Sequence, residues 1–231
     1  MIWALHGNLG SRDDWNRLRH QLPQIEPVDL WASPPSPFDQ WSHRLNDLVS
    51  ATDPDPVLLG YSLGGRLAMH CATGLDSAWK AAVFVSAHPG LTSETEKAAR
   101  LVKDRDWALK LRNDGVEAFL EAWNRQSVFS GDPIPKEQSR IVSQHQNAIA
   151  QAFETWSLGR QMDQRDLLRQ TKIPQLWVVG EKDAKFRDLA ESATLENPAA
   201  ALKVIENCGH RVIHERPDAL ASLIREFLSG L

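Results

Sequence analysis

The sequence predicts an α/β domain, built on a mostly parallel sheet of about six or seven strands with an inserted helical cap. Short apolar runs alternate with helical segments along most of the chain, which is the pattern of parallel strands joined by crossover helices. The runs are rich in Val, Leu, Ile and Trp and lack strict alternation, as expected of strands buried on both faces. One long section contains helical patterns and no convincing strand.

Six apolar runs are the predicted strands, and helices are expected between them. Because each run is short and most are followed by a helical pattern, the strands should lie parallel in one sheet. The strands are expected near Ile2–His6, Val28–Trp31, Val57–Tyr61, Ala81–Ala87, Gln175–Val179 and Ala201–Ile205. The helices are expected near Trp15–Leu22, Phe38–Ala51, Leu63–Gly74, Arg187–Leu195 and Pro217–Leu228.

The section without strands divides the predicted domain. It contains amphipathic patterns such as "ETEKAARLVKDRDWALKLR" and "SRIVSQHQNAIAQAFETWSL", with apolar residues at helical spacing. An all-helical block between two strands predicts a subdomain inserted into the sheet domain. We therefore expect a core formed by residues 1–91 and 171–231, and a helical cap formed by residues 92–170.

Composition and charge exclude several classes of function. The 231 residues carry a formal net charge of −4, which gives no electrostatic footprint for binding nucleic acid. No apolar run reaches the length of about 18 residues that a membrane span needs, and the first residues lack the layout of a signal peptide. Cys71 and Cys208 are the only cysteines, as in proteins that keep reduced thiols. A cytoplasmic protein without a membrane span is expected.

The stretch "VLLGYSLGGRLAMH", Val57 to His70, holds a serine between glycines at the end of an apolar run. Its pattern G-x-S-x-G allows a sharp turn from strand to helix, so the hydroxyl of Ser62 projects above the sheet edge. The start of the new helix directs free N–H groups and its positive dipole end to the same place. The pattern predicts a catalytic serine, with a plain tight turn as the alternative.

The partner of this serine should be a histidine that takes its proton. His210, in "IENCGHRVIHERP", is the preferred partner because it lies in a glycine-containing loop after the last predicted strand. His214 is the competitor, and its other interpretation is a partly buried polar residue. Cys208 is also considered as a catalytic thiol, although a small apolar filler beside the turn is the favoured interpretation.

The histidine in turn needs an orienting carboxylate, which in the order Ser, acid, His should follow the preceding strand. Asp183, in "LWVVGEKDAKF", lies in a turn-forming loop three residues after Gly180. Glu181 is closer to the strand end, and Asp188 is expected in the next helix. Asp183 is therefore the predicted acid.

Backbone amides complete the predicted site. The segment "LHGNLG", Leu5 to Gly10, follows the first strand, and its turn can direct N–H groups at Ser62. The expected oxyanion-stabilising pair is the amides of Asn8 and Leu63. His6 is expected to brace this turn and not to carry a proton.

A resemblance to a known family rests on seven strings: "LHGNLGSRDDW", "GYSLGGRLAMH", "SAHPGL", "AARLVKDRDWA", "WNRQSVF", "GEKDAKFR" and "GHRVIHERP". The whole chain resembles the α/β-hydrolase superfamily, and the strings resemble the 2-succinyl-6-hydroxy-2,4-cyclohexadiene-1-carboxylate synthases of menaquinone and phylloquinone biosynthesis. The resemblance implies a triad of Ser62, Asp183 and His210 that abstracts a proton instead of driving hydrolysis. It also implies pyruvate elimination from a multiply carboxylated cyclohexene, with no metal or organic cofactor.

Arg66 fits such a substrate for a reason that is independent of the resemblance. It lies one helical turn beyond Ser62, so both side chains should point to similar faces of the helix start. A guanidinium offers paired, charge-assisted hydrogen bonds to a carboxylate, whereas an enzyme for neutral esters has no use for it. The alternative is a surface arginine on a solvated face. The expected partner is a small polycarboxylate.

The family pattern implies further substrate-binding residues. It matches Arg100 in "AAR", Trp123 in "WNRQSVF" and Tyr61 beside the serine. The family often has another arginine in the helix after "VF", and here the chain departs from it. The local sequence "RIVSQHQN" places His145 at that position, with two alternatives, Gln144 and Arg140. The departure concerns the residue that binds one substrate carboxylate and does not affect the triad.

Two other functions stay open on the sequence alone. The first is hydrolysis of a carboxylic ester or a carbon–carbon bond, because the same triad suits acyl transfer with Ser62 as the nucleophile. The second is a non-catalytic protein of the same fold that binds a small molecule. The intact set of serine, acid and histidine favours catalysis over mere binding.

Overall fold

The computed structural model describes residues 1–231, and its core is one six-stranded sheet in the order β2-β1-β3-β4-β5-β6. All neighbouring strands pair in parallel. The α/β fold class with a parallel sheet is thereby confirmed. The strands are β1 (Ile2–Leu5), β2 (Ile25–Val28), β3 (Val57–Tyr61), β4 (Ala81–Val85), β5 (Gln175–Gly180) and β6 (Ala200–Ile205).

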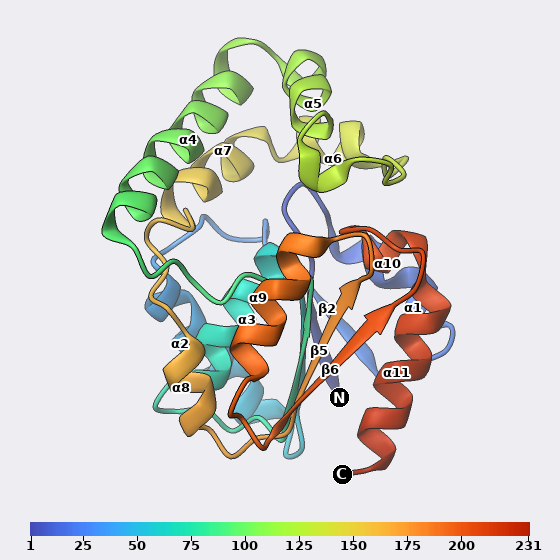
Figure 1. The fold of residues 1–231 in the computed structure, drawn as a ribbon. Coiled ribbons are helices and arrows are strands. Elements are labelled where there is room, and N and C mark those ends of the chain that lie inside the picture. The colour runs from blue at the N-terminus through green and yellow to red at the C-terminus, as the bar shows by residue number, and fades with distance from the viewer.

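Helices cover both faces of the sheet (Figure 1). One face carries α1 (Asn16–Arg19), α10 (Val212–Glu215) and α11 (Pro217–Ser229). The short 3-10 helix η1 (Arg12–Trp15) directly precedes α1. The other face carries α2 (Phe38–Thr52), α3 (Leu63–Thr73), α8 (Arg165–Gln170) and α9 (Ala184–Thr194). This three-layer arrangement buries the apolar runs of the central strands on both sides.

The second strand lies three residues earlier than the sequence predicts. The prediction of a strand at Val28–Trp31 is wrong, because the strand is Ile25–Val28 and includes Pro27. Proline has no N–H to donate to the hydrogen-bond ladder and is disfavoured inside a sheet. The residue is tolerated because β2 is an edge strand that pairs only with β1.

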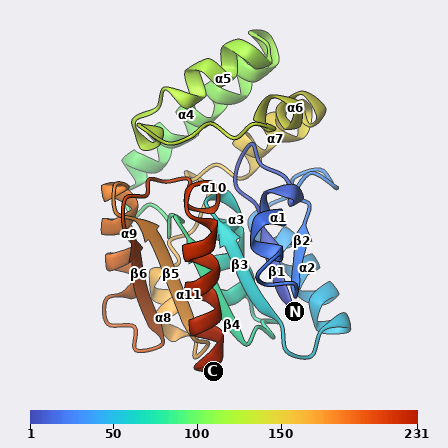
Figure 2. The same cartoon turned by 90° about the vertical axis from the view of Figure 1, so that its right-hand side faces the viewer.

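A helical block joins β4 to β5 and lies over the carboxyl ends of the strands (Figures 1 and 2). It contains no strand. Its last helix, α8, returns to the sheet domain and packs against α3 and α9. The remaining elements are α4 (Glu94–Asn113), α5 (Val116–Asn124), η2 (Ser127–Phe129), α6 (Gln138–Gln144) and α7 (Gln146–Thr155).

Two apolar clusters lie on opposite faces of the sheet. The larger one joins the sheet to α2, α3 and the helical block, and it contains Cys71. The smaller one lies under α1 and α11 and contains Cys208. Both cysteines are free and buried. None of the helices combines the length and the apolar character that crossing a lipid bilayer requires.

Candidate active site

Ser62 lies on a strained turn between β3 and α3. Its backbone has φ 52° and ψ −110°, outside the regions that L-residues favour. The flanking glycines make room for this turn, because a Cβ on Gly60 would lie 2.5 Å from the carbonyl oxygen of Gly64, and one on Gly64 would lie 2.1 Å from that of Leu5. The turn thus places the Ser62 hydroxyl at the carboxyl edge of the sheet, beneath the helical block.

A hydrogen-bonded chain connects Ser62 to a buried carboxylate. The Nε2 atom of His210 lies 3.2 Å from Ser62 Oγ, and its Nδ1 atom lies 2.7 Å from Asp183 Oδ2. The side chains of His210 and Asp183 are only 4% and 3% exposed. With the carboxylate accepting from Nδ1–H, Nε2 is the nitrogen that can accept the serine proton. The arrangement can therefore activate Ser62.

The alternative candidates for the acid and the histidine, Glu181, Asp188 and His214, do not contact Ser62. Glu181 is exposed and accepts from the backbone N–H of Asn207, and Asp188 is exposed on α9. His214 packs its ring edge-on against Tyr61, with the ring centroids 6.4 Å apart. Desolvation by burial lowers the pKa of His214 to about 4, so its ring is neutral near pH 7. Asp183 and His210 are the pair that reaches Ser62.

Three aromatic rings enclose His210. The ring centroid of Phe186 lies 4.4 Å from that of His210, and the rings of Phe129 and Tyr61 lie 5.6 Å and 5.9 Å away. Phe129 comes from the helical block, whereas the other two belong to the sheet domain. Such packing fixes the imidazole plane and excludes water from it.

Two backbone N–H groups close to Ser62 in the fold have no protein acceptor. The N–H of Leu63 is at the first position of α3, where no intrahelical partner exists, and neither it nor the N–H of Asn8 donates to a protein acceptor. The turn that carries Asn8 is braced by His6, which bonds the oxygen of Gly7 through Nδ1 and accepts from the N–H of Leu30 through Nε2. These amides can stabilise a developing negative charge.

A cavity of about 40 Å³ lies between Ser62 and the helical block. Four of the sequence-predicted site residues line it together with Ser62: Asn8, Tyr61, Trp123 and His210. Burial raises the pKa of the Tyr61 hydroxyl above its ordinary value, so it stays protonated. The other lining residues are Leu9, Gly10, Asp14, Phe129, Pro135, Gln138, Ile141, Arg211 and His214.

Arg66 does not line this cavity but lies buried behind Ser62 on α3. Its Nε donates to Oε1 of Gln161 at 2.5 Å, and its Nη2 donates to the backbone oxygen of Trp156 at 2.7 Å. Both acceptors are neutral, so no carboxylate is paired directly with this guanidinium. Desolvation, with a further contribution from the charge of Arg100, lowers the pKa of Arg66 to about 9, so the guanidinium is still charged at pH 7. It is not the solvated surface arginine of the alternative interpretation.

Arg100 is held by an acidic neighbour. Its Nε donates to Oδ1 of Asp104 at 2.8 Å, and its side chain is 32% exposed. The other carboxylate oxygen of Asp104 accepts from the hydroxyl of Ser157 and the backbone N–H of Leu158. Asp104 thus fixes Arg100 at the base of the helical block and partly neutralises it.

None of the three expected substitutes for the additional arginine lines the cavity. Gln144 is exposed and bonds Arg140, which also pairs with Glu137. His145 is half-buried, and its charge contributes to lowering the pKa of Asp29. The helix α6 instead presents Gln138 and Ile141 to the cavity.

Comparison with known proteins identifies the family. The Alpha/beta hydrolase family matches residues 4–223. The chain belongs to this family. Proteins named 2-succinyl-6-hydroxy-2,4-cyclohexadiene-1-carboxylate synthase are similar over nearly its full length. The one from Photorhabdus laumondii is 33% identical, over 99% of this chain and 85% of the relative, and the one from Enterobacter sp. (strain 638) is 32% identical, over 97% and 90%.

A solved structure extends this similarity to three dimensions. MenH from S. aureus matches with a TM-score of 0.90 and 25% sequence identity, over 99% of this chain and 93% of MenH. The comparisons confirm the resemblance to the synthases that the sequence motifs indicated.

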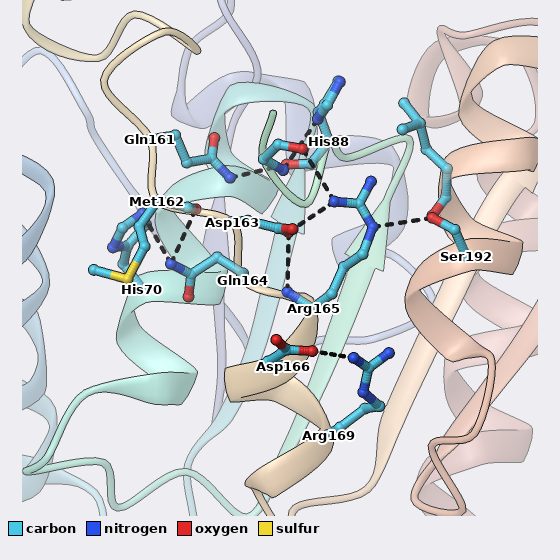
Figure 3. A network of polar contacts seen from close by, with 12 residues as sticks. His70, His88, Gln161, Met162, Asp163, Gln164, Arg165, Asp166, Arg169 and Ser192 are labelled. Carbon is cyan, nitrogen blue, oxygen red and sulfur yellow. Dashed lines mark hydrogen bonds and ion pairs between the residues drawn. The ribbon is translucent and has the colours of Figure 1, made fainter. Parts of the chain in front are cut away.

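The joint between the two parts of this alpha/beta hydrolase is a polar network (Figure 3). Gln161 donates to the backbone oxygen of His88, the N–H of Gln164 donates to that of Pro89, and Arg165 donates to that of Gly90. The segment that leaves the sheet is therefore bonded to the segment that returns to it. Since Gln161 also holds Arg66, this joint fixes the buried cation behind Ser62.

His88, in this joint, is a buried neutral imidazole. Its Nδ1 accepts from the N–H of Gly90 at 3.1 Å, so the proton of the neutral ring lies on Nε2. Desolvation, followed by the charges of Arg66 and Lys185, lowers the pKa of His88 to about 2. It can donate one hydrogen bond but adds no charge to a region that already contains several cations.

Sequence reasoning missed two charged residues of the cavity, Asp14 and Arg211. Arg211 directly follows His210 in "CGHRV", and Asp14 follows the turn that carries Asn8. Adjacency to a predicted catalytic residue was a signal that could have indicated Arg211. Asp14 gave no comparable signal, since acidic residues are common in a first helical turn.

Proposed function

We propose that this protein eliminates pyruvate from 2-succinyl-5-enolpyruvyl-6-hydroxy-3-cyclohexene-1-carboxylate to give 2-succinyl-6-hydroxy-2,4-cyclohexadiene-1-carboxylate. The observation that carries this choice is the full-length similarity to synthases that bear the product's name. The buried guanidinium of Arg66 behind Ser62, which has no directly paired carboxylate, supports an anionic substrate. On this proposal the protein is a carbon–oxygen lyase of menaquinone or phylloquinone biosynthesis that needs no metal or organic cofactor.

The proton transfer would start at Ser62. His210, oriented by Asp183, takes the hydroxyl proton, and the serine oxygen takes a ring proton next to an electron-withdrawing group. The electron pair of that C–H bond forms the new double bond, and the carbon–oxygen bond to the enolpyruvyl group breaks. The leaving enolate receives a proton and becomes pyruvate. No water is consumed, and the serine and imidazole return to their starting states.

Charge that develops on the substrate would be met by fixed donors. The N–H groups of Asn8 and Leu63 lie free beside Ser62 and suit an oxygen that becomes negative. Loss of one such donor typically costs about 2.7–4 kcal/mol of barrier. Arg66 and Arg100 would attract the carboxylates, and Tyr61 and Trp123, which line the cavity, would contact the substrate, whereas His145 lies outside the lining.

The test is direct incubation with the enolpyruvyl precursor. Pyruvate release is followed with a coupled dehydrogenase assay for the wild type and for Ser62→Ala. We expect release by the wild type and a loss of at least about a thousandfold in Ser62→Ala, because both the proton acceptor and its activation disappear. Wild-type activity in that variant would defeat the assignment.

Ester hydrolysis is the second candidate, since Ser62, His210 and two free amides also suit acyl transfer. A panel of short neutral esters run beside the precursor separates the two. Turnover of esters without pyruvate release would assign a hydrolase. Retention of the precursor without turnover of either would assign a binding protein.

A further inference from the structure

The cavity above Ser62 contains a buried arginine that comes from the histidine loop. Arg211 is 3% exposed and lines the cavity beside His210. Its Nη1 donates to the backbone oxygen of Pro133 at 3.0 Å, and its Nη2 donates to Oδ1 of Asn124. Its guanidinium carbon lies 4.3 Å from the centre of the Phe129 ring. All three contacts are to neutral groups of the helical block.

The charge of Arg211 has no carboxylate partner within 4.0 Å. Two acidic neighbours are engaged by backbone: Asp132 accepts from the N–H of Arg211 itself, and Glu215 accepts from the N–H of Gly209. Burial lowers the pKa of Arg211 from its ordinary value, and the neighbouring groups Tyr61, Asp132 and Glu215 only partly oppose this effect. Two of its five guanidinium N–H donors are used, and the other three have no protein acceptor.

Arg211 is also the one permanent cation in the lining of this cavity. His214 is neutral near pH 7, and Arg66 and Arg100 lie outside the lining. The only carboxylate of the lining is Asp14. Helix α6, where the additional arginine was expected, presents no cation to the cavity.

We infer that Arg211 is an anion-binding residue of the active cavity, where its guanidinium grips one carboxylate of the substrate. It supplies, from the sheet domain, the positive charge that the helical block does not. The identity of that substrate rests on the function proposed above, whereas the anion site itself does not. Its ligand class is a small di- or tricarboxylate.

A purely structural role makes the opposite prediction for one substitution. Arg211 hydrogen-bonds Asn124 and Pro133 of the helical block from the loop of His210, so its role could be only to hold these two segments together, as a structural tie. Asn124→Asp places a carboxylate of nearly the same shape against Nη2. A tie would be strengthened by the new ion pair, but an anion site would be neutralised by it.

The experiment measures capture of Ser62 by an uncharged fluorophosphonate and its protection by succinate, with succinamide as the uncharged match. In Asn124→Asp we expect the succinate concentration for half-protection to rise about 10-fold or more, with the capture rate in the absence of succinate unchanged. In Arg211→Gln we expect the succinate concentration for half-protection to rise by a factor about ten times larger than the factor by which the capture rate without succinate falls. Arg216→Gln, an exposed arginine five residues away, should behave as the wild type.

Two results would overturn the inference. One is wild-type succinate protection in Asn124→Asp, a variant that retains Arg211 and should fold even if Arg211→Gln does not. The other is a wild type that succinate does not protect at any concentration. Pyruvate release from the precursor is measured in parallel. A wild type that releases no pyruvate but shows the expected protection pattern would refute the proposed function and leave the anion site in place.

Discussion

Asp14 is an acidic residue in a place that disfavours its charge. Desolvation by burial, partly opposed by the hydrogen bond from the N–H of Ser11, raises its pKa from 3.8 to about 6. The folded state therefore binds the Asp14 proton more tightly than the unfolded state does. The stabilisation from this group is complete below about pH 4 and is lost as the pH rises towards 6.

Replacing Asp14 by Asn should stabilise the fold at neutral pH. The amide keeps an acceptor for the N–H of Ser11 but has no charge to desolvate. At pH 7.5 we expect a gain of roughly 1–3 kcal/mol in the free energy of unfolding, shrinking towards zero near pH 4. Urea unfolding at several pH values measures it. Asp13→Asn, an exposed neighbour, is the control, and a gain that does not depend on pH would contradict the explanation.

The residues of the site differ in how far they could be predicted. Ser62 lies in a local pattern whose backbone demands two glycines, and Asp183 and His210 each follow a strand at the same edge of the sheet. Such positions follow from chain order. Arg211 becomes a cavity residue only because Asn124, Pro133 and Phe129 of a distant segment pack against it, and no local pattern encodes that contact.

At the scale of elements, the turn from β3 to α3 is one of the tightest junctions of the fold. A Cβ on Gly64 would lie 2.1 Å from the backbone oxygen of Leu5, and backbone cannot move aside as a flexible side chain does. Gly64→Ala should therefore separate α3 from β1 and destabilise the protein by about 2 kcal/mol or more.

Urea unfolding of Gly64→Ala against Gly230→Ala measures this effect. At Gly230 the nearest atom to an added Cβ lies 3.6 Å away and φ is −95°, so we expect a change within about 0.5 kcal/mol. Equal stability of the two variants would show that the junction relaxes.

Element types were more predictable than element boundaries. Five of the six strands overlap their predicted ranges closely. Four of them, β1, β3, β4 and β5, are nearly continuous buried apolar runs, and the fifth, β6, is a partly exposed edge strand. The strand β2 was misplaced because its place at the edge of the sheet, which makes Pro27 acceptable, is a property of the whole sheet. The return of α8 to the sheet domain likewise depends on packing against α3 and α9.

At the scale of the whole molecule, the helical block restricts access to Ser62. The cavity of about 40 Å³ is far smaller than the roughly 300–1,000 Å³ that drug-sized ligands occupy, so a polycarboxylate requires the block to move. Arg165 opposes such movement, because it bonds Gly90, Asp163 and, through Nε, Ser192 of α9 (Figure 3).

Loosening this joint should favour large reagents over small ones. In Arg165→Gln we expect capture of Ser62 by a bulky fluorophosphonate to quicken about three- to tenfold relative to a small one. Arg169→Gln, the control, removes a half-buried arginine of the same helix whose side chain hydrogen-bonds Asp166. If the ratio of the capture rates for the bulky and the small reagent equals the wild-type ratio in both variants, access to Ser62 does not depend on the joint.

The two buried thiols, Cys71 and Cys208, are natural probes of local opening on the two faces of the sheet. Desolvation raises the pKa of Cys71 above its ordinary value and that of Cys208 to about 12, so neither is a thiolate while its surroundings stay closed. They lie in separate apolar layers on opposite sides of the sheet. If Cys71 and Cys208 are alkylated at different rates, the faster one identifies the apolar layer that opens more readily, and no label has to be introduced.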